Sequence, residues 1–226
     1  SFIDIKDTIK LVKLSKRMNL CLAEATVYAY HPQIKLIKDA FLKAHSNPMR
    51  LTAIFSFPPL DRDNFRNKKE LGGGSLWDLG VYVVSPGRIF FNEIPKEVFC
   101  RISARTPKDN LDISFAVFLT YSKGRSFVGH FGFDTEYCNC LNILGPDVSI
   151  DIERIFSTPA GLENEIKIKQ KNQINILRAP KADSFALFLQ EVIKAIQIKD
   201  YGIFRQDLID DATSLQRLHV SSQKGY

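Results

Sequence analysis

The sequence predicts an α+β protein built on a large, mostly antiparallel β-sheet with helices on one face. Three observations support this fold class. From residue 50 onward most segments alternate apolar and polar residues with the period of two that is typical of strands. The connections between these segments are short and rich in Gly, Asn, Asp and Pro, which favours hairpins. The last forty-five or so residues instead carry apolar side chains at helical spacing.

The first 24 residues have the pattern of a helix followed by a strand. Ser1 and Asp4 resemble a capping box and apolar residues follow at helical spacing, so we expect a helix over residues 2–18. The apolar segment 20–28 predicts a short strand. A helix followed by a strand is the last unit of a parallel α/β fold. The sequence lacks the earlier units and starts at Ser1 instead of methionine, so we expect it to be part of a longer protein.

The remaining elements follow in order along the chain. Pro32 is suited to the first turn of a helix, and Ser75 to the cap of another. Near the C-terminus, Phe185 and Ile196 belong to an apolar stripe of a helix that is expected to cover the sheet. The expected helices span residues 31–44, 75–91, 182–197 and 204–219, and the expected strands span residues 50–57, 96–104, 112–121, 125–133, 137–144, 148–152, 165–169 and 173–177.

The strand expected at residues 112–121 shows how the sheet should be covered. Phe115, Val117 and Leu119 fall on one strongly apolar face, and the other face is mixed. An antiparallel sheet of this kind packs helices on one face. The mixed face is therefore free for a ligand or for a second copy of the chain.

Composition limits the class of protein. A chain of 226 residues with 45% hydrophobic content can bury the core of one large domain. No segment has the ~20 apolar residues of a membrane span and none resembles a signal peptide, so we expect a cytoplasmic protein with no membrane partner. Lys and Arg exceed Asp and Glu by 31 − 25 = 6. This mild excess suits an anionic small ligand as well as nucleic acid. The cations are scattered and form no basic stripe with interleaved aromatic residues, so we expect no nucleic-acid partner.

The four cysteines lie in apolar runs without the spacing of metal ligands. We interpret them as reduced packing residues and predict no metal site. The positions are Cys21, Cys100, Cys138 and Cys140.

The most informative segment is residues 71–82, where a glycine run opens the helix that carries Asp78 and Tyr82. Residues four apart share one helical face, so both side chains should point into the same space. There Tyr82 could transfer a proton while Asp78 fixes its orientation or charge. The alternative is a helix-entry turn followed by a buried tyrosine whose hydroxyl is hydrogen-bonded. The glycines permit positive φ angles and a close approach of backbone.

Several of these motifs together resemble one known family. Residues 24–32 (EATVYAYHP), 63–66 (DNFR) and 70–82 (ELGGGSLWDLGVY) are similar to the glucose–fructose oxidoreductase / inositol dehydrogenase (Gfo/Idh/MocA) family, and segments 131–134 and 144–154 follow in the same order. The resemblance covers nearly the whole chain but only the second half of a usual member. It implies that residues 1–24 are the end of a nucleotide-binding Rossmann domain. Residues 25–226 would then be the substrate-binding and oligomerisation domain.

The resemblance implies hydride transfer between NAD(P) and a hydroxyl or ketone carbon of a sugar, cyclitol or nucleotide sugar. Tyr82 would be the proton donor or acceptor with Asp78 beside it, helped by a lysine of the missing first domain. Tyr28, His31 and Pro32 are the implied cofactor contacts. His31 has an alternative role as a helix cap.

Three further residues are expected to bind substrate. Arg66 could bind an anionic group such as a sugar-nucleotide phosphate, or it could form a salt bridge that holds its loop. Trp77 is expected in the pocket wall or in the core. His130, on the mixed face of its strand, could line a ligand surface, although a lone strand histidine is more often packed or half-exposed.

Two departures from the family pattern lead to a second hypothesis. Ala29 stands where the family often has arginine, and no G-x-G-x-x-G motif is present, because Gly72 to Gly74 follow a polar loop instead of a strand. We therefore expect the isolated chain neither to bind NAD(P) well nor to catalyse turnover. The alternative function is a non-catalytic dimerisation or ligand-binding module. Either function allows a homo-oligomer through the mixed sheet face.

Overall fold

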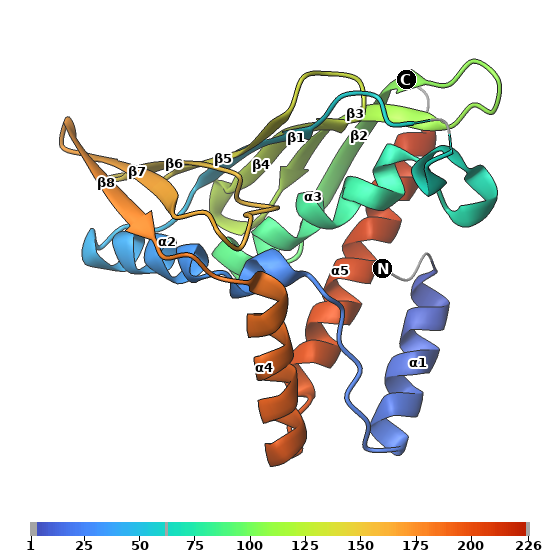
Figure 1. The fold of residues 1–226 in the computed structure, drawn as a ribbon, viewed down its shortest axis with the longest axis horizontal. Coiled ribbons are helices and arrows are strands. Elements are labelled where there is room, and N and C mark those ends of the chain that lie inside the picture. The colour runs from blue at the N-terminus through green and yellow to red at the C-terminus, as the bar shows by residue number, and fades with distance from the viewer. Residues whose placement is uncertain (1–3, 62, 225–226) are drawn as a thin grey trace.

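The sheet and its covering helices form two layers in the computed structural model, which describes residues 4–61 and 63–224 (Figure 1). The eight strands have the order β2-β3-β4-β1-β5-β6-β7-β8. All neighbours are antiparallel except β1 and β4, which run parallel. The predicted fold class, a mostly antiparallel sheet with helices on one face, is therefore confirmed. The strands are β1 (Arg50–Ser56), β2 (Glu97–Arg105), β3 (Asp112–Thr120), β4 (Ser126–Gly132), β5 (Cys138–Leu144), β6 (Ser149–Glu153), β7 (Asn164–Gln170) and β8 (Gln173–Ala179).

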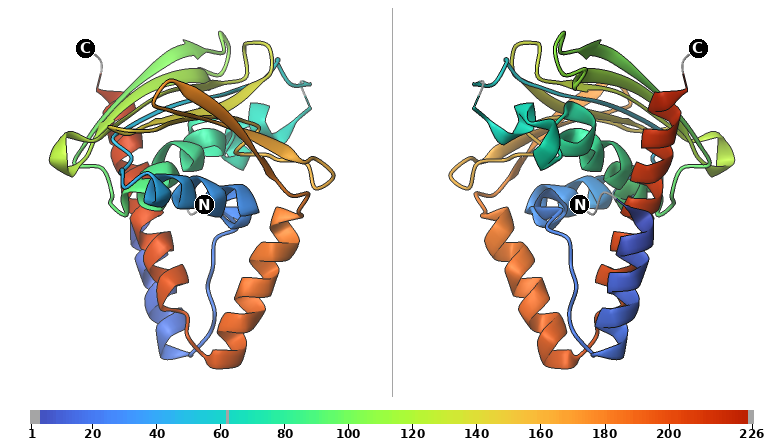
Figure 2. Two further views of the ribbon diagram at one scale, coloured as in Figure 1. Left: turned by 90° about the vertical axis from the view of Figure 1, so that its left-hand side faces the viewer. Right: turned by 90° about the vertical axis from the view of Figure 1, so that its right-hand side faces the viewer.

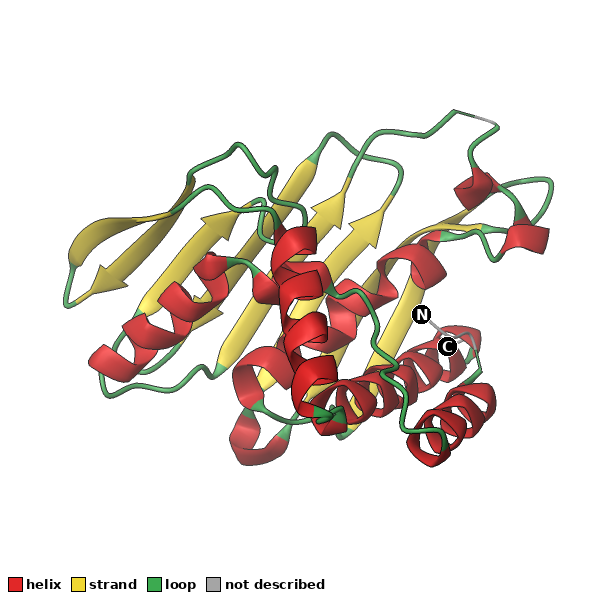
Figure 3. Cartoon of the chain, turned by 60° about the horizontal axis from the view of Figure 1, so that its bottom comes forward, coloured by secondary structure: helices red, strands yellow, loops and turns green. Residues whose placement is uncertain are grey.

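Three helices cover one face of the sheet (Figure 3). Helix α3 (Ser75–Phe91) packs on β3 and β4, α2 (Pro32–Lys43) packs on β7 and β8, and α5 (Gly202–Gln223) packs on β2 and on α3. The face of β3 that the sequence marked as apolar is the buried one, with Phe115 and Leu119 almost fully enclosed. Phe118, on the opposite face, is 43% exposed.

The N-terminal segment differs from the prediction in two respects. Helix α1 spans Ile5–Arg17 and its cap is Asp4, whose carboxylate accepts a hydrogen bond from the Lys6 N–H at 2.7 Å. Ser1, the other half of the predicted capping box, lies outside the described residues. The strand predicted over residues 20–28 is wrong, since residues 20–26 are irregular and a 3₁₀ helix, η1 (Val27–Tyr30), follows. A strand needs a hydrogen-bonding neighbour, and no strand of the described chain lies beside this segment.

Helix α4 (Ser184–Ile198) does not cover the sheet, contrary to the prediction. Together with α1 and part of α5 it extends away from the sheet, and residues 18–26 run between these helices (Figure 2). Only Phe188 and Ala195 of α4 are buried, against η1 and the start of α5. Phe185 is 61% exposed and Ile196 is 49% exposed. Helical spacing identified the apolar stripe correctly, but it carries no information about the surface that the stripe meets.

All four cysteines are unpaired, and the Cys138 and Cys140 sulfurs lie 3.7 Å apart on one face of β5.

Within the described residues no helix combines the length and the apolar character that crossing a membrane requires.

Candidate active site

Asp78 and Tyr82 lie one turn apart on α3, and both line a cavity of about 280 Å³. Trp77 borders the same cavity, which is one of the two places that the sequence left open for it. The other walls come from Glu24 to Tyr28, from Val81 and from Phe156. The helical spacing thus placed an acid and a phenol in one cavity, and neither is sealed inside the core.

Aromatic rings surround the Tyr82 side chain. Phe55, Phe156 and Tyr28 have ring centroids 5.0, 5.2 and 5.9 Å from that of Tyr82. Burial among these rings raises the pKa of the Tyr82 hydroxyl, the nearby Asp78 carboxylate raises it further, and Arg66 opposes both effects. Tyr82 is therefore protonated at neutral pH, which suits a proton donor.

Arg66 reaches the site from the loop between β1 and α3. Its Nε donates a hydrogen bond to the Asp78 carboxylate at 2.7 Å. The sequence left open an anion contact or a salt bridge that holds the loop, and the structure shows a salt bridge whose partner is the candidate active-site carboxylate. The Arg66 Nη nitrogens make no hydrogen bond within the described part of the chain, so the anion contact stays a proposal.

The N-terminus of α3 is capped by a residue far away in sequence. The expected cap, Ser75, instead donates its own hydroxyl to the Asp112 carboxylate at 3.0 Å, and the Leu76 N–H donates to the same carboxylate at 2.6 Å. Asp112 stands at the start of β3, so it supplies the negative charge that favours a helix N-terminus. No local motif could have revealed this cap, because the two partners meet only in the folded sheet.

We expect Asp112→Ala to lower the free energy of unfolding by about 1–2 kcal/mol, since it leaves the Leu76 N–H and the Ser75 hydroxyl without their acceptor. Urea unfolding followed by circular dichroism measures this change. Asp109→Ala, at an exposed turn in the same hairpin, is the matched control and should have no measurable effect. Equal stabilities of the two variants would contradict the role of Asp112 as the cap.

The three residues that were predicted to contact the cofactor have mostly structural roles. The Tyr28 ring borders the cavity, but its hydroxyl is hydrogen-bonded to Ser85 at 2.7 Å. His31 is 1% exposed and caps α2, because its Nδ1 accepts a hydrogen bond from the Gln33 N–H at 3.3 Å. Pro32 is the first residue of α2. The alternative role of His31 as a cap is therefore the one that the structure shows, and its buried Nε2 has no partner among the described residues.

His130 does not join this site. It is exposed on the face of β4 opposite to Phe127 and Phe131, which are buried under the helices. The sheet therefore separates His130 from the cavity that Asp78 and Tyr82 line, and its predicted role at a ligand surface on the open face stays a prediction. The side-chain alternation placed it correctly on the mixed face, but could not show that the acid and the phenol lie on the other side.

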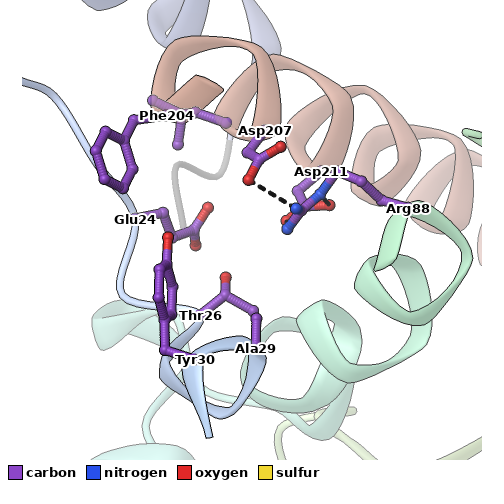
Figure 4. A pocket seen from close by; sticks show the side chains of 9 residues that line it. Glu24, Thr26, Ala29, Tyr30, Arg88, Phe204, Asp207 and Asp211 are labelled. Carbon is purple, nitrogen blue, oxygen red and sulfur yellow. Dashed lines mark hydrogen bonds and ion pairs between the residues drawn. The ribbon is translucent and has the colours of Figure 1, made fainter. Parts of the chain in front are cut away.

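Sequence reasoning missed His219, whose ring contacts that of Trp77 in a tilted arrangement with a centroid distance of 3.4 Å. It also missed an ion-pair cluster beside the cavity (Figure 4). In this cluster Arg88 binds Asp211 through Nε at 3.0 Å and Nη2 at 2.7 Å, and it binds Asp207 through Nη1 at 2.7 Å. These partners are too far apart in the sequence for any motif to connect them.

The ion-pair cluster borders a small cavity of about 20 Å³, enough for roughly one water. Glu24 lines both this cavity and the larger one, so the cluster adjoins the candidate active site. Ala29, the position at which the family often has arginine, also lines it. Burial raises the pKa of Asp211 to about 6 despite the opposing charge of Arg88.

The fold and site together define a class: an α+β domain whose central helix presents an acid and a phenol to a cavity beside an open antiparallel sheet. Residues 46–151 match the C-terminal domain of the GFO/IDH/MocA family, the family that the motifs predicted.

Individual relatives agree with this assignment. The chain is 31% identical over 178 residues to dTDP-3,4-didehydro-2,6-dideoxy-alpha-D-glucose 3-reductase of Saccharopolyspora spinosa, covering 78% of this chain and 53% of the relative. It is 27% identical over 157 residues to scyllo-inositol 2-dehydrogenase (NADP(+)) IolU of Bacillus subtilis, covering 66% of this chain and 46% of that protein. The chain thus spans about half the length of the curated relatives it matches.

A solved structure shows the same fold. KijD10, a 3-ketoreductase from Actinomadura kijaniata in complex with NADP and TDP-benzene, superimposes with a TM-score of 0.88 at 20% identity. The match covers 97% of this chain and 68% of that one. The open sheet and its helices are therefore a shared architecture.

Proposed function

We propose that this chain is the substrate-binding portion of an NAD(P)-dependent oxidoreductase that acts on a ketone or hydroxyl of a sugar, cyclitol or nucleotide sugar by hydride transfer. The observation that carries the proposal is the pair of Asp78 and Tyr82 on the wall of one cavity. The names of the relatives support the substrate class, because they include nucleotide-sugar 3-reductases and an inositol dehydrogenase. A protonated Tyr82 can serve as the proton donor when a ketone is reduced.

In the reductive direction Tyr82 is the proton donor. Its hydroxyl gives a proton to the ketone oxygen while the carbonyl carbon receives a hydride, so the product is an alcohol and Tyr82 becomes a phenolate. The nicotinamide, when bound, supplies the hydride. Asp78 is held by Arg66 at the cavity wall, and the rings of Phe55 and Phe156 pack against the ring of Tyr82.

The residues of this chain fit only the reacting end of such a cofactor. The cavity bordered by Tyr28, Trp77 and Tyr82 offers flat aromatic walls for a ring. The eight-stranded sheet has one parallel pair and no doubly wound βαβ unit to hold a pyrophosphate. The proposal therefore assigns cofactor binding to a Rossmann domain that ends within residues 1–24. Tyr28, His31 and Pro32 would contribute from the joining segment.

A non-catalytic dimerisation module is the second proposal, and the open sheet face supports it. Phe99 and Phe118 stack at 6.1 Å there and are 47% and 43% exposed. A second copy of the chain could cover this face in either case, so homo-oligomerisation does not separate the two functions. Turnover and cofactor binding do.

The test uses purified full-length protein with NADPH or NADH and three ketone substrates: a nucleotide-linked 3-keto sugar, a free keto sugar and an inosose. We expect loss of the reduced-nicotinamide absorbance with at least one substrate, fastest with the nucleotide-linked one. A protein that self-associates, binds neither cofactor in calorimetry and reduces none of the ketones would instead be the non-catalytic module.

A further inference from the structure

The glycine run before α3 encloses a piece of the chain's own backbone. The Gly73 N–H donates to the Lys68 carbonyl at 3.0 Å, and the Gly74 N–H donates to the Arg66 carbonyl at 2.9 Å. A Cβ atom at Gly73 would lie 2.5 Å from the Arg66 carbonyl oxygen and 2.8 Å from that of Lys68. Both neighbours are backbone atoms that cannot move aside cheaply. Position 73 must therefore be glycine for residues 66–68 to pack here.

This packing fixes the position of the Arg66 side chain. The Arg66 N–H donates to the Asn64 side chain at 3.0 Å, so its backbone is held on both the N–H and the carbonyl side. The guanidinium lies 4.6 Å from the centre of the Phe65 ring and bonds Asp78 through Nε. A flexible loop would not hold a long side chain in one geometry, but this loop is tied down at three points.

The charged and titratable groups around Tyr82 are few. Asp78 belongs to the same helix and Arg66 comes from the loop, while Tyr28 and Glu24 face the cavity from the segment before α2. Besides Tyr28, the rings that pack against Tyr82 are apolar, namely Phe55 from β1 and Phe156 from the segment after β6. Arg66 is the one cation of this set, and it is bound directly to the carboxylate of Asp78, four residues before Tyr82 on the same helix.

We propose that Arg66 is a positioning residue that the glycine run holds on Asp78, so that its charge offsets the carboxylate and eases proton release from Tyr82. The inference rests on the proposed function, in which Tyr82 donates the proton. Its physical basis is general: an unpaired carboxylate next to a phenol opposes ionisation of the phenol, and a guanidinium bound to that carboxylate cancels much of the effect. The glycine run therefore serves this side chain and not a phosphate.

The direct test measures titration of Tyr82 by ¹⁹F NMR in the chain labelled with 3-fluorotyrosine, a residue that titrates at lower pH than tyrosine. The resonance that disappears in Tyr82→Phe identifies the site. Arg66→Ala should move the titration to higher pH, because Asp78 loses its counter-charge. Asp78→Asn should move it to lower pH. The double variant Arg66→Ala/Asp78→Asn should titrate between the two single variants, below Arg66→Ala and above Asp78→Asn, because it lacks both opposing charges.

Two further variants link the effect to the glycine run. Gly73→Ala should shift the titration in the same direction as Arg66→Ala, and Arg66→Lys should restore part of it through the retained charge. Lys69→Ala, at an exposed cation of the same loop, is the matched control and should leave the titration unchanged. In the full-length enzyme acting on a free keto sugar, which offers Arg66 no phosphate, Arg66→Ala should lower kcat about tenfold with little change in KM, a change of roughly 1.4 kcal/mol in the barrier.

The outcomes separate this inference from the proposed function. An unchanged Tyr82 titration in Arg66→Ala, or a double variant that titrates like Arg66→Ala alone, would overturn the role of Arg66 whether or not the enzyme is active. A shifted titration together with full activity of Tyr82→Phe would keep the electrostatic coupling and reject Tyr82 as the proton donor.

Discussion

Tyr82→Phe is expected to lower kcat of the full-length enzyme by about 10²–10⁴-fold, the usual contribution of a positioned general acid. The substitution removes one oxygen and keeps the ring that contacts Phe55, Phe156 and Tyr28, so the cavity retains its walls. Affinity for the reduced cofactor should stay nearly constant. Steady-state kinetics with the best ketone substrate, together with calorimetric titration of the cofactor, measures the two quantities separately.

The control for this substitution is Tyr137→Phe. Tyr137 is exposed on its strand-end loop, where its hydroxyl contacts Ser157, so its loss should leave kcat unchanged. If the Tyr82→Phe enzyme kept the wild-type kcat, Tyr82 would not be the general acid. The pairing of Asp78 and Tyr82 in one cavity would then no longer support the proposed function. A large drop in both kcat and thermal stability would instead indicate loss of packing.

Arg88→Ala is expected to destabilise the chain by about 3–5 kcal/mol, the largest effect on stability that the structure predicts. The guanidinium makes two hydrogen bonds to Asp211, whose side chain is only 3% exposed, and an ion pair with Asp207. Removing it leaves two carboxylates unpaired between α3 and α5, where water cannot fully solvate them. Urea unfolding of the 226-residue chain measures the loss.

The pH dependence gives this prediction a second test. The pKa of Asp211 is raised to about 6 in the folded chain, so the folded state binds this proton more tightly than the unfolded state. Stability from this group is therefore present at low pH and is lost as pH rises from about 4 to 6. Without Arg88 the same pKa should rise further, because the attractive charge is gone. The deficit of Arg88→Ala relative to the wild type should thus be smaller at pH 5 than at pH 8.

Arg178→Ala is the matched control for Arg88→Ala. Arg178 also pairs with a carboxylate, that of Glu165, but both side chains are more than half exposed. Exposed pairs contribute about 0–1 kcal/mol, so this variant should unfold almost like the wild type at every pH. A deficit of Arg88→Ala that matches the control, or that does not change with pH, would show that the cluster is solvated and carries little stability.

Local patterns were sufficient for most elements of the fold. The period of two located every strand from β1 to β8, and the helix carrying Asp78 and Tyr82 was placed at its observed bounds, Ser75–Phe91. These patterns succeed because strand and helix residues alternate between buried and exposed faces with fixed periods. They failed at residues 20–28, since an apolar segment forms a strand only when another strand lies next to it.

The sequence by itself determined the fold class, the family and the shared helical face of Asp78 and Tyr82, because each depends on spacing between near neighbours. Only the tertiary structure decided that Asp112 caps α3, that Arg66 binds Asp78 and that Arg88 joins Asp211. It also placed His130 on the opposite face of the sheet from the cavity. Helix α4 extends away from the sheet, so its apolar stripe stays largely exposed. These contacts join groups that are distant in the chain, so no local period encodes them, and they form only when the sheet and helices have packed.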